Sequence, residues 1–159
     1  SIGEVKTKES YKLNERHYGK LQGRTHEEVE AEVGKDMVHT WRRSYDVRPP
    51  ELDITDPRFP GNDPKYKDVL KFELPLSESL KDTEERVVEY FEDEISTFLR
   101  VDENVLVVAS GNTLRSLVKY LEGLSAEDIT KVEISTGEII VYEMDDKLMI
   151  LKKTTYNVK

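Results

Sequence analysis

The clearest helix that the hydrophobic pattern predicts begins at Ser79. Seven apolar residues recur there at the 3.6-residue spacing of one helix face, and the opposite face is charged. They are Leu80, Val87, Val88, Phe91, Ile95, Phe98 and Leu99. A second amphipathic helix is predicted from Leu114 to Leu121, and Gly123 should end it.

Two shorter helices are predicted before a proline-rich loop. Thr25 and Glu28 have the spacing of a capping box, which predicts a short helix after Thr25. A further helix should span Asp36 to Tyr45 and end before the double proline that follows. Residues 47–65 contain five prolines and show little periodicity. Long loops in compact domains tend to be functional, so this loop is a candidate functional segment.

Strands are predicted between and after the helices. Residues 104–109 consist of Asn104 and five consecutive apolar residues, a run that is typical of a strand covered on both faces. Residues 4–13 alternate weakly and predict an exposed or edge strand, and residues 138–144 and 148–153 predict a terminal hairpin. Buried strands that alternate with amphipathic helices predict an α/β sandwich, here as a single domain over residues 1–159.

The composition is that of a soluble globular protein. Apolar and charged residues each make up 36% of the chain, and no apolar run approaches a membrane span. The N-terminus has no signal-peptide core, so a cytoplasmic location is expected. A net charge of -9 disfavours binding to nucleic acid or to an anionic membrane, and an anionic substrate would need a local basic pocket. The absence of cysteine excludes disulfides and thiol chemistry.

One candidate anion site lies where the apolar run gives way to Ser110-Gly111-Asn112 and a helix. Backbone N–H groups at a helix start, beside a glycine, can bind a phosphate, and the Asn112 amide could donate as well. A plain strand-to-helix turn explains the same residues. Ser110 has no G-x-S-x-G context and no assignable histidine partner, so it is a poor candidate for a nucleophile.

Two further groups suit the binding or movement of charge. Arg42 and Arg43 present guanidinium forks that match carboxylate and phosphate oxygens, although a solvated helix face is the simpler explanation. Glu15-Arg16-His17-Tyr18 places an acid, a cation, a base and a phenol together, which suits proton transfer but also occurs in ordinary loops. The chain has three histidines, His17, His26 and His39. They lack the spacing of a metal site, and no metal is expected.

Three motifs occur in one order along the chain. They are Leu13-Asn14-Glu15-Arg16-His17-Tyr18-Gly19-Lys20-Leu21-Gln22-Gly23, Trp41-Arg42-Arg43-Ser44-Tyr45-Asp46 and Gly111-Asn112-Thr113-Leu114-Arg115-Ser116-Leu117-Val118-Lys119-Tyr120-Leu121. Together they resemble the signatures of the bisphosphoglycerate-dependent phosphoglycerate mutases, and the similarity covers essentially the whole chain. The resemblance implies the histidine-phosphatase fold, a three-layer sandwich with a mostly parallel sheet whose first strands are absent from this sequence.

The resemblance also implies an activity and a site. The family interconverts 2- and 3-phosphoglycerate in glycolysis and gluconeogenesis through a phosphohistidine, with 2,3-bisphosphoglycerate as primer and no metal. By position, Glu15 would be the proton donor and acceptor for the substrate hydroxyl. The residues that would bind the substrate are Arg16, His17, Tyr18, His26, Arg42, Arg43, Gly111 and Asn112.

Three departures from the family pattern bear on activity. An Arg-His-Gly motif, whose histidine takes the phosphoryl group, precedes the equivalent of Leu13 in the family, and this sequence contains no such motif. Ser110 stands where the family has its second active-site histidine, and a hydroxyl cannot supply the positive charge of an imidazolium. His26 stands where the family usually has a lysine that contacts the substrate.

The chain is therefore expected to be an N-terminally truncated mutase domain that is inactive alone. Unpaired strand edges and exposed apolar faces should cause aggregation or capture of a partner. A homo-oligomer, or another chain that supplies the N-terminal part, would cover them. One alternative is a catalytically dead module that binds phosphate or a partner. Another is a phosphatase, which the Glu15 motif supports less well.

Overall fold

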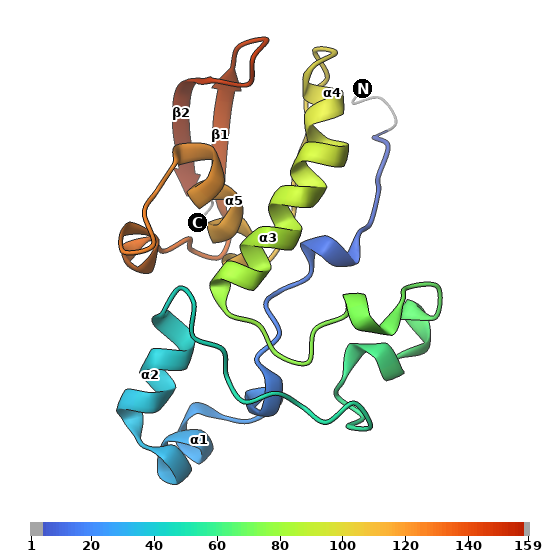
Figure 1. Ribbon diagram of the computed structural model, residues 1–159. Coiled ribbons are helices and arrows are strands. Elements are labelled where there is room, and N and C mark those ends of the chain that lie inside the picture. Colours follow the sequence, from blue (N-terminus) through green and yellow to red (C-terminus); the bar gives the residue numbers. More distant parts are fainter. Residues whose placement is uncertain (1–4, 158–159) are drawn as a thin grey trace.

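The first two helices of the computed structural model, which describes residues 5–157, form a pair at one end of the molecule (Figure 1). Helix α1 spans His26–Val33 and helix α2 spans Lys35–Arg43. The predicted capping box is confirmed, because the Thr25 side chain accepts from the Glu28 N–H and the Glu28 carboxylate accepts from the Thr25 N–H. Helix α2 ends two residues earlier than predicted.

The long predicted helix is confirmed and lies in the middle of the molecule (Figure 1). Helix α3 (Leu80–Tyr90) continues through a π-helical turn (Phe91–Ile95) into α4 (Ser96–Leu99). Ser79 caps it, and Asp82 completes a capping box. Its apolar face packs against α5 (Gly111–Glu122), which ends as predicted at Gly123 in the left-handed conformation.

The predicted terminal hairpin is also confirmed. Strand β1 (Glu138–Met144) pairs antiparallel with β2 (Ile150–Asn157), so the second strand begins and ends later than predicted. The hairpin is tied to α5 because the Tyr142 hydroxyl and the Lys153 ammonium both contact the Glu122 carboxylate. It therefore extends the α3–α5 layer at the end of the molecule away from α1 and α2 (Figure 1).

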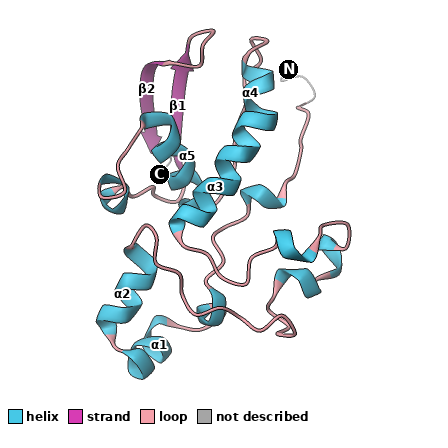
Figure 2. Cartoon of the chain, in the orientation of Figure 1, coloured by secondary structure: helices cyan, strands magenta, loops and turns pink. Residues whose placement is uncertain are grey.

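The predicted parallel sheet is not formed by the described residues, whose only sheet is the β1–β2 pair (Figure 2). The expected buried strand over residues 104–109 is wrong, because these residues adopt no strand and Leu106 and Val108 are 79% and 82% exposed. Residues 5–10 form no strand either, and residue 4 of that expected strand lies outside the described range. A strand requires a neighbour for its backbone hydrogen bonds, so a β-prone sequence alone does not form one.

Most of the buried apolar residues form three separate clusters. The largest lies between α3 and α5 around Val87 and Phe91, the second joins α1 and α2 through Val29 and Val38, and the third is built on Phe59 in the proline-rich loop. Short 3-10 turns connect these parts. They span Tyr11–Leu13, Gly19–Leu21, Pro60–Asn62, Pro64–Tyr66, Lys71–Glu73 and Asp128–Lys131.

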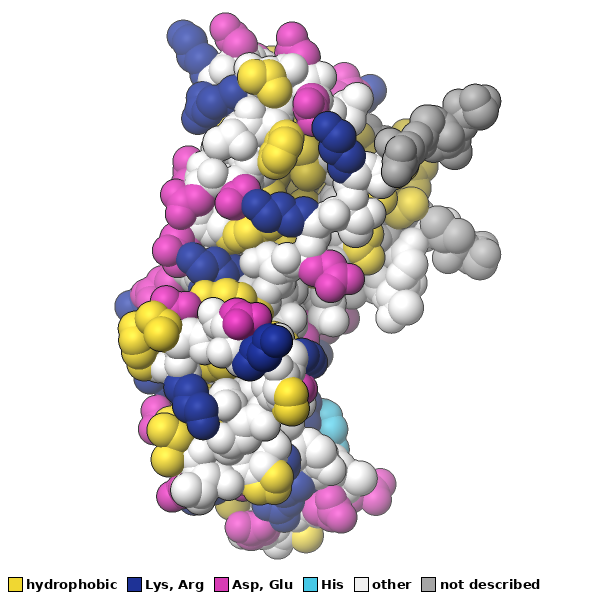
Figure 3. Space-filling view, turned by 90° about the vertical axis from the view of Figure 1, so that its right-hand side faces the viewer, with side chains coloured by type: hydrophobic (Ala, Val, Ile, Leu, Met, Phe, Trp, Pro, Cys, Tyr) yellow, Lys and Arg dark blue, Asp and Glu magenta, His cyan; other side chains and the backbone are white. Residues whose placement is uncertain are grey.

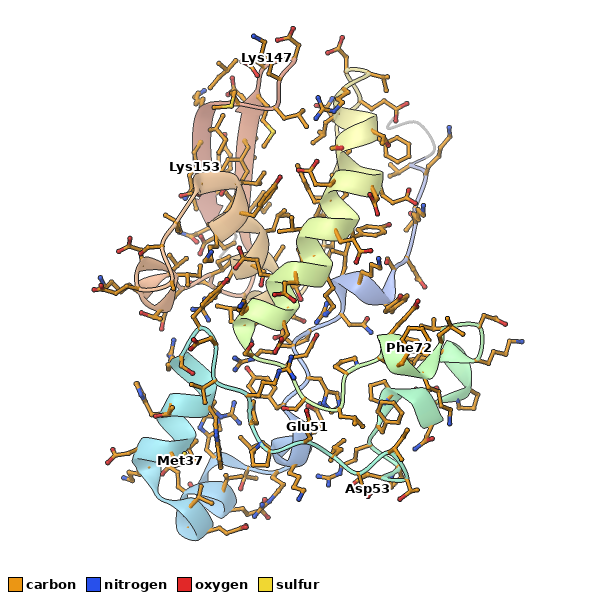
Figure 4. The ribbon with its side chains drawn as sticks, viewed as in Figure 1. Met37, Glu51, Asp53, Phe72, Lys147 and Lys153 are labelled. Carbon is orange, nitrogen blue, oxygen red and sulfur yellow. The ribbon has the colours of Figure 1, made fainter. Side chains whose placement is uncertain are left out.

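Many apolar side chains remain on the surface. Figure 3 shows them scattered among charged residues over one face of the molecule. Phe72, labelled in Figure 4 beside the proline-rich loop, is 83% exposed. Single exposed apolar residues are normal, but a consecutive run such as residues 104–109 requires a covering partner or exposes an aggregation site.

Candidate functional site

A buried ion pair holds the backbone on both sides of Glu15. Glu78 is 3% exposed and accepts hydrogen bonds from the His17 backbone N–H at 2.8 Å and from Nε and Nη2 of Arg86 at 2.6 and 2.9 Å. The Arg86 guanidinium also donates to the Lys12 carbonyl oxygen at 2.7 Å. Because Glu78 immediately precedes the capped start of α3, this helix fixes the position of the candidate site.

The Glu15 carboxylate lies at the start of α5. Its Oε1 accepts from Nδ2 of Asn112 at 2.6 Å, and its Oε2 accepts from the Asn112 backbone N–H at 3.2 Å. The first N–H groups of a helix have no partner within the helix and favour an anion. The helix start at Ser110-Gly111-Asn112 thus binds a carboxylate of the chain itself. Two of the predicted site residues, 97 positions apart, are in direct contact.

Two arginines lie over the ring of Tyr18, and two more are linked to them through their charges. The Cζ atoms of Arg16 and Arg42 lie 4.4 and 5.0 Å from the centroid of its ring. Burial, together with the nearby charges of Arg43 and Arg16, lowers the pKa of Arg115. Arg16 and Arg42 are attracted to the aromatic ring, but the guanidinium groups repel one another. This arginine cluster (Arg16, Arg42, Arg43 and Arg115) therefore favours an anionic ligand.

Several N–H groups of the arginine cluster are buried and have no hydrogen-bond partner among the described residues. They are Nε and Nη1 of Arg16, Nε of Arg42 and Nε of Arg115. Arg16, which is 2% exposed, uses Nη2 on the carbonyl oxygens of Trp41 and Arg42 at the end of α2. A buried donor without an acceptor is costly, and an anionic ligand would bring the missing oxygens.

The adjacent residues Arg42 and Arg43 point in different directions, as neighbours on a helix do. Arg42 is half-buried against Tyr18, whereas Arg43 is exposed and pairs with Glu133 at 2.9 Å. Glu133 is itself 71% exposed at its side chain, so the ion pair is a weak one that a ligand can replace.

His17 is buried, and backbone groups contact both of its ring nitrogens. Its Nδ1 accepts from the Gly19 N–H at 3.1 Å, so the proton lies on Nε2, which points to the Arg58 carbonyl oxygen at 3.4 Å. Burial lowers the pKa of His17. Gly19 has φ of +56°, and a Cβ there would lie 2.2 Å from the Pro50 carbonyl oxygen, so this turn requires glycine. The geometry leaves His17 no open nitrogen for a substrate.

The remaining predicted site residues make no hydrogen bond to the arginine cluster among the described residues. His26 is the first residue of α1, is exposed and makes no hydrogen bond with the described residues. Ser110 caps α5 by its backbone, and its hydroxyl has no hydrogen-bond partner in residues 5–157. Gly111 is exposed, and a Cβ added there would meet no described atom within 4 Å beyond its chain neighbours and its own helix backbone. A ligand therefore has room to approach the helix start at this glycine.

Three positioning residues were not predicted from the sequence: Glu78, Arg86 and Arg115. Arg115 had a signal that could have identified it, because it is a charged residue on the buried side of an amphipathic helix. Glu78 precedes a helix cap, and nothing in its local pattern indicates that it contacts the backbone of His17, 61 positions away.

A cavity of about 250 Å³ borders Glu15. Its lining includes Asn14, Glu15, His17 and Arg58. Arg58 joins the proline-rich loop to the candidate site, because its Nη1 donates to the Gln22 carbonyl oxygen at 2.9 Å. The same guanidinium hydrogen-bonds Asp56 and lowers the pKa of that carboxyl to about 2. The loop predicted as functional thus forms one wall of the cavity.

Neither a metal cluster nor a membrane helix occurs in the part of the chain that the structure describes. No group of three or more His, Cys, Asp or Glu side chains within residues 5–157 could hold a metal ion. Among the same residues, no helix has the length and apolar character needed to cross a membrane.

Comparison with known families identifies the class of protein. The family model of the histidine phosphatase superfamily (branch 1) matches residues 2–156. The chain therefore belongs to the histidine phosphatase superfamily. Membership indicates phosphoryl-transfer chemistry of the phosphatase or mutase type, which agrees with an arginine cluster beside a carboxylate.

Proposed function

We propose that this chain binds phosphoglycerates and carries the acid/base and substrate-binding part of a cytoplasmic phosphoglycerate mutase of glycolysis and gluconeogenesis. One observation supports it most. Arg16 and Arg42 lie over Tyr18, and Arg115 and Tyr18 both hydrogen-bond Asn112 beside Glu15. Each of these three arginines has a buried N–H group without an acceptor among the described residues. A phosphoglycerate has a phosphate and a carboxylate, and guanidinium groups bind the oxygens of both.

The reaction would transfer a phosphoryl group between a phosphohistidine and a substrate hydroxyl, with 2,3-bisphosphoglycerate as primer. The hydroxyl oxygen bonds to phosphorus as the P–N bond breaks, and the hydroxyl proton passes to Glu15, which returns it in the reverse half-reaction. Arg16, Arg42 and Arg43 stabilise the charge on the phosphoryl group, so the proposal requires no metal.

The phosphohistidine would come from a segment outside residues 5–157 or from another chain. His17 uses both ring nitrogens on backbone groups, and His26 and His39 are exposed on α1 and α2. A homo-oligomer or a partner chain that supplies a histidine beside Glu15 would complete the site.

The direct test is a calorimetric titration with 3-phosphoglycerate. Replacing Arg42 by methionine keeps much of the packing against Tyr18 but removes the charge. Because a hydrogen bond to a charged group contributes about 1.5–3 kcal/mol, the Arg42→Met variant should bind about 10- to 150-fold more weakly. Arg100→Met is the matched control, since Arg100 is exposed and belongs to no ion pair among the described residues.

The control variant should bind like the wild type. If Arg42→Met and Arg100→Met lose the same affinity, the effect is one of net charge and the proposed site is refuted. If the wild type binds neither 3-phosphoglycerate nor 2,3-bisphosphoglycerate, the chain recognises neither the substrate nor the primer, and the proposed function is refuted.

The second candidate function is a module that binds such an anion without turnover. Ser110 favours it, because this residue stands where the family has its second active-site histidine. The unmodified chain should bind these ligands without conversion under either function, so the test adds an N-terminal Arg-His-Gly segment together with Ser110→His. Phosphorus NMR then follows a mixture with 3-phosphoglycerate and 2,3-bisphosphoglycerate. Formation of 2-phosphoglycerate by the restored chain supports the mutase, and binding without conversion supports the module.

A further inference from the structure

Arg115 connects the start of α5 to a neighbouring turn. Its side chain is 7% exposed, and it lies one helical turn after Asn112. Nη1 donates to Oδ1 of Asn112 at 3.1 Å, and Nη2 donates to the carbonyl oxygen of Ile129 at 2.6 Å. Ile129 is completely buried in the 3-10 turn Asp128–Lys131. The guanidinium therefore has a fixed position beneath the candidate site.

The contact with Arg115 decides which way the Asn112 amide faces. A guanidinium can only donate hydrogen bonds, whereas an amide has one oxygen that accepts and one nitrogen that donates. With Oδ1 held by Arg115, Nδ2 faces Oε1 of Glu15 at 2.6 Å and the Tyr18 hydroxyl at 2.8 Å. The opposite orientation would place Oδ1 against a carboxylate oxygen and the amide nitrogen against the guanidinium. Both of those contacts are repulsive.

Arg115 is unusual among buried cations because it has no acidic partner among the described residues. Its Nε is buried without a hydrogen-bond partner there, and neighbouring charges come from Arg16 and Arg43. Glu133 is the acid that contributes to its electrostatic environment, and Glu133 pairs with Arg43. Keeping such a cation buried is costly, so its contact with Asn112 is more than a by-product of packing.

We infer that Arg115 is a positioning residue, which locks the Asn112 amide so that Nδ2 donates to the carboxylate of Glu15. The inference rests on the proposed function for the role of Glu15 in proton transfer. In that reaction Arg115 does not touch the substrate. It keeps one carboxylate oxygen bound to Asn112 and thereby fixes the direction in which the carboxylate meets the substrate hydroxyl.

The test follows the side-chain amide of Asn112 by proton–nitrogen NMR in the full chain without any ligand. Its signal is assigned by its loss in the Asn112→Asp variant. In the wild type, the Asn112 NH₂ protons should exchange with solvent about tenfold more slowly than those of Asn104, an exposed residue, because one hydrogen bond contributes about that factor. Arg115→Met should remove the difference. Arg115→Lys, which keeps a donor, should preserve most of it.

Three results would overturn the inference. The first is Asn112 exchange as fast as Asn104 exchange in the wild type, and the second is unchanged exchange in Arg115→Met. The third is equal loss in the methionine and lysine variants, which would assign Arg115 a packing role only. If Arg115→Met does not fold, the exchange rates of Asn112 in the wild type and in Arg115→Lys are compared with that of Asn104. Exchange of Asn112 as fast as that of Asn104 in either protein then overturns the inference. Since no ligand is present, the result is independent of whether phosphoglycerate binds, which the calorimetric titration tests separately.

Discussion

Replacing Glu78 by alanine should destabilise the chain strongly, because it breaks a buried ion pair from one side. The side chains of Glu78 and Arg86 are only 4% and 13% exposed. In the variant the Arg86 guanidinium keeps its contact with the Lys12 carbonyl oxygen but loses both bonds to the carboxylate. The backbone N–H of His17 loses its acceptor as well.

The expected loss is about 4 kcal/mol, since removal of one partner of a buried pair costs about 3–5 kcal/mol. The uncompensated guanidinium accounts for most of it, and an unsatisfied buried N–H costs about 1–3 kcal/mol. Removing Arg86 as well should recover part of the loss, because the two residues interact directly and their effects are not additive.

The assay is urea unfolding followed by Trp41 fluorescence and circular dichroism. The midpoint should fall in Glu78→Ala while the slope stays unchanged. Glu143→Ala is the matched control, because the Glu143–Lys152 pair is 57% and 64% exposed at its side chains and should contribute about 0–1 kcal/mol. A loss in Glu78→Ala no larger than in this control would refute the reasoning that the pair holds the Glu15 backbone.

Two further predictions concern pH and assembly. Burial lowers the pKa of His17 in the folded chain below the 6.5 of the unfolded chain. On acidification the unfolded state therefore binds the proton first. The free energy of unfolding should fall as the pH drops from 6.5 through the pKa of His17 in the folded chain. Urea titrations at several pH values measure this dependence. The decrease in the free energy of unfolding should disappear in His17→Gln and persist in His26→Gln, whose histidine is exposed. The same pH dependence in the wild type and in His17→Gln would contradict the prediction. The exposed apolar run at residues 104–109 should drive self-association, so Leu106→Glu should lower the sedimentation coefficient measured at high concentration. Met37→Glu, at a 45% exposed site on α2 (Figure 4), is its control, and an equal effect of both variants would count against residues 104–109 as the contact.

The sequence by itself was sufficient for the elements that depend on neighbours along the chain. The capping box at Thr25, the amphipathic helix after Ser79 and the glycine that ends α5 were all predicted, because caps and helical periodicity act within a few residues. The terminal hairpin was predicted for the same reason, since its strands are adjacent. Membership of the histidine phosphatase superfamily, indicated by the motifs, was confirmed over residues 2–156.

The tertiary structure alone decided how the site is assembled. Glu15 and Asn112 were predicted separately as an acid/base residue and a phosphate contact, and only the fold brings them within 2.6 Å. The same holds for Arg115, whose guanidinium orients that amide, and for residues 104–109, which have strand-like composition but no strand partner among the described residues. Such contacts join residues far apart in sequence, and their free energy depends on burial and on which partner is present. Composition and spacing carry neither quantity.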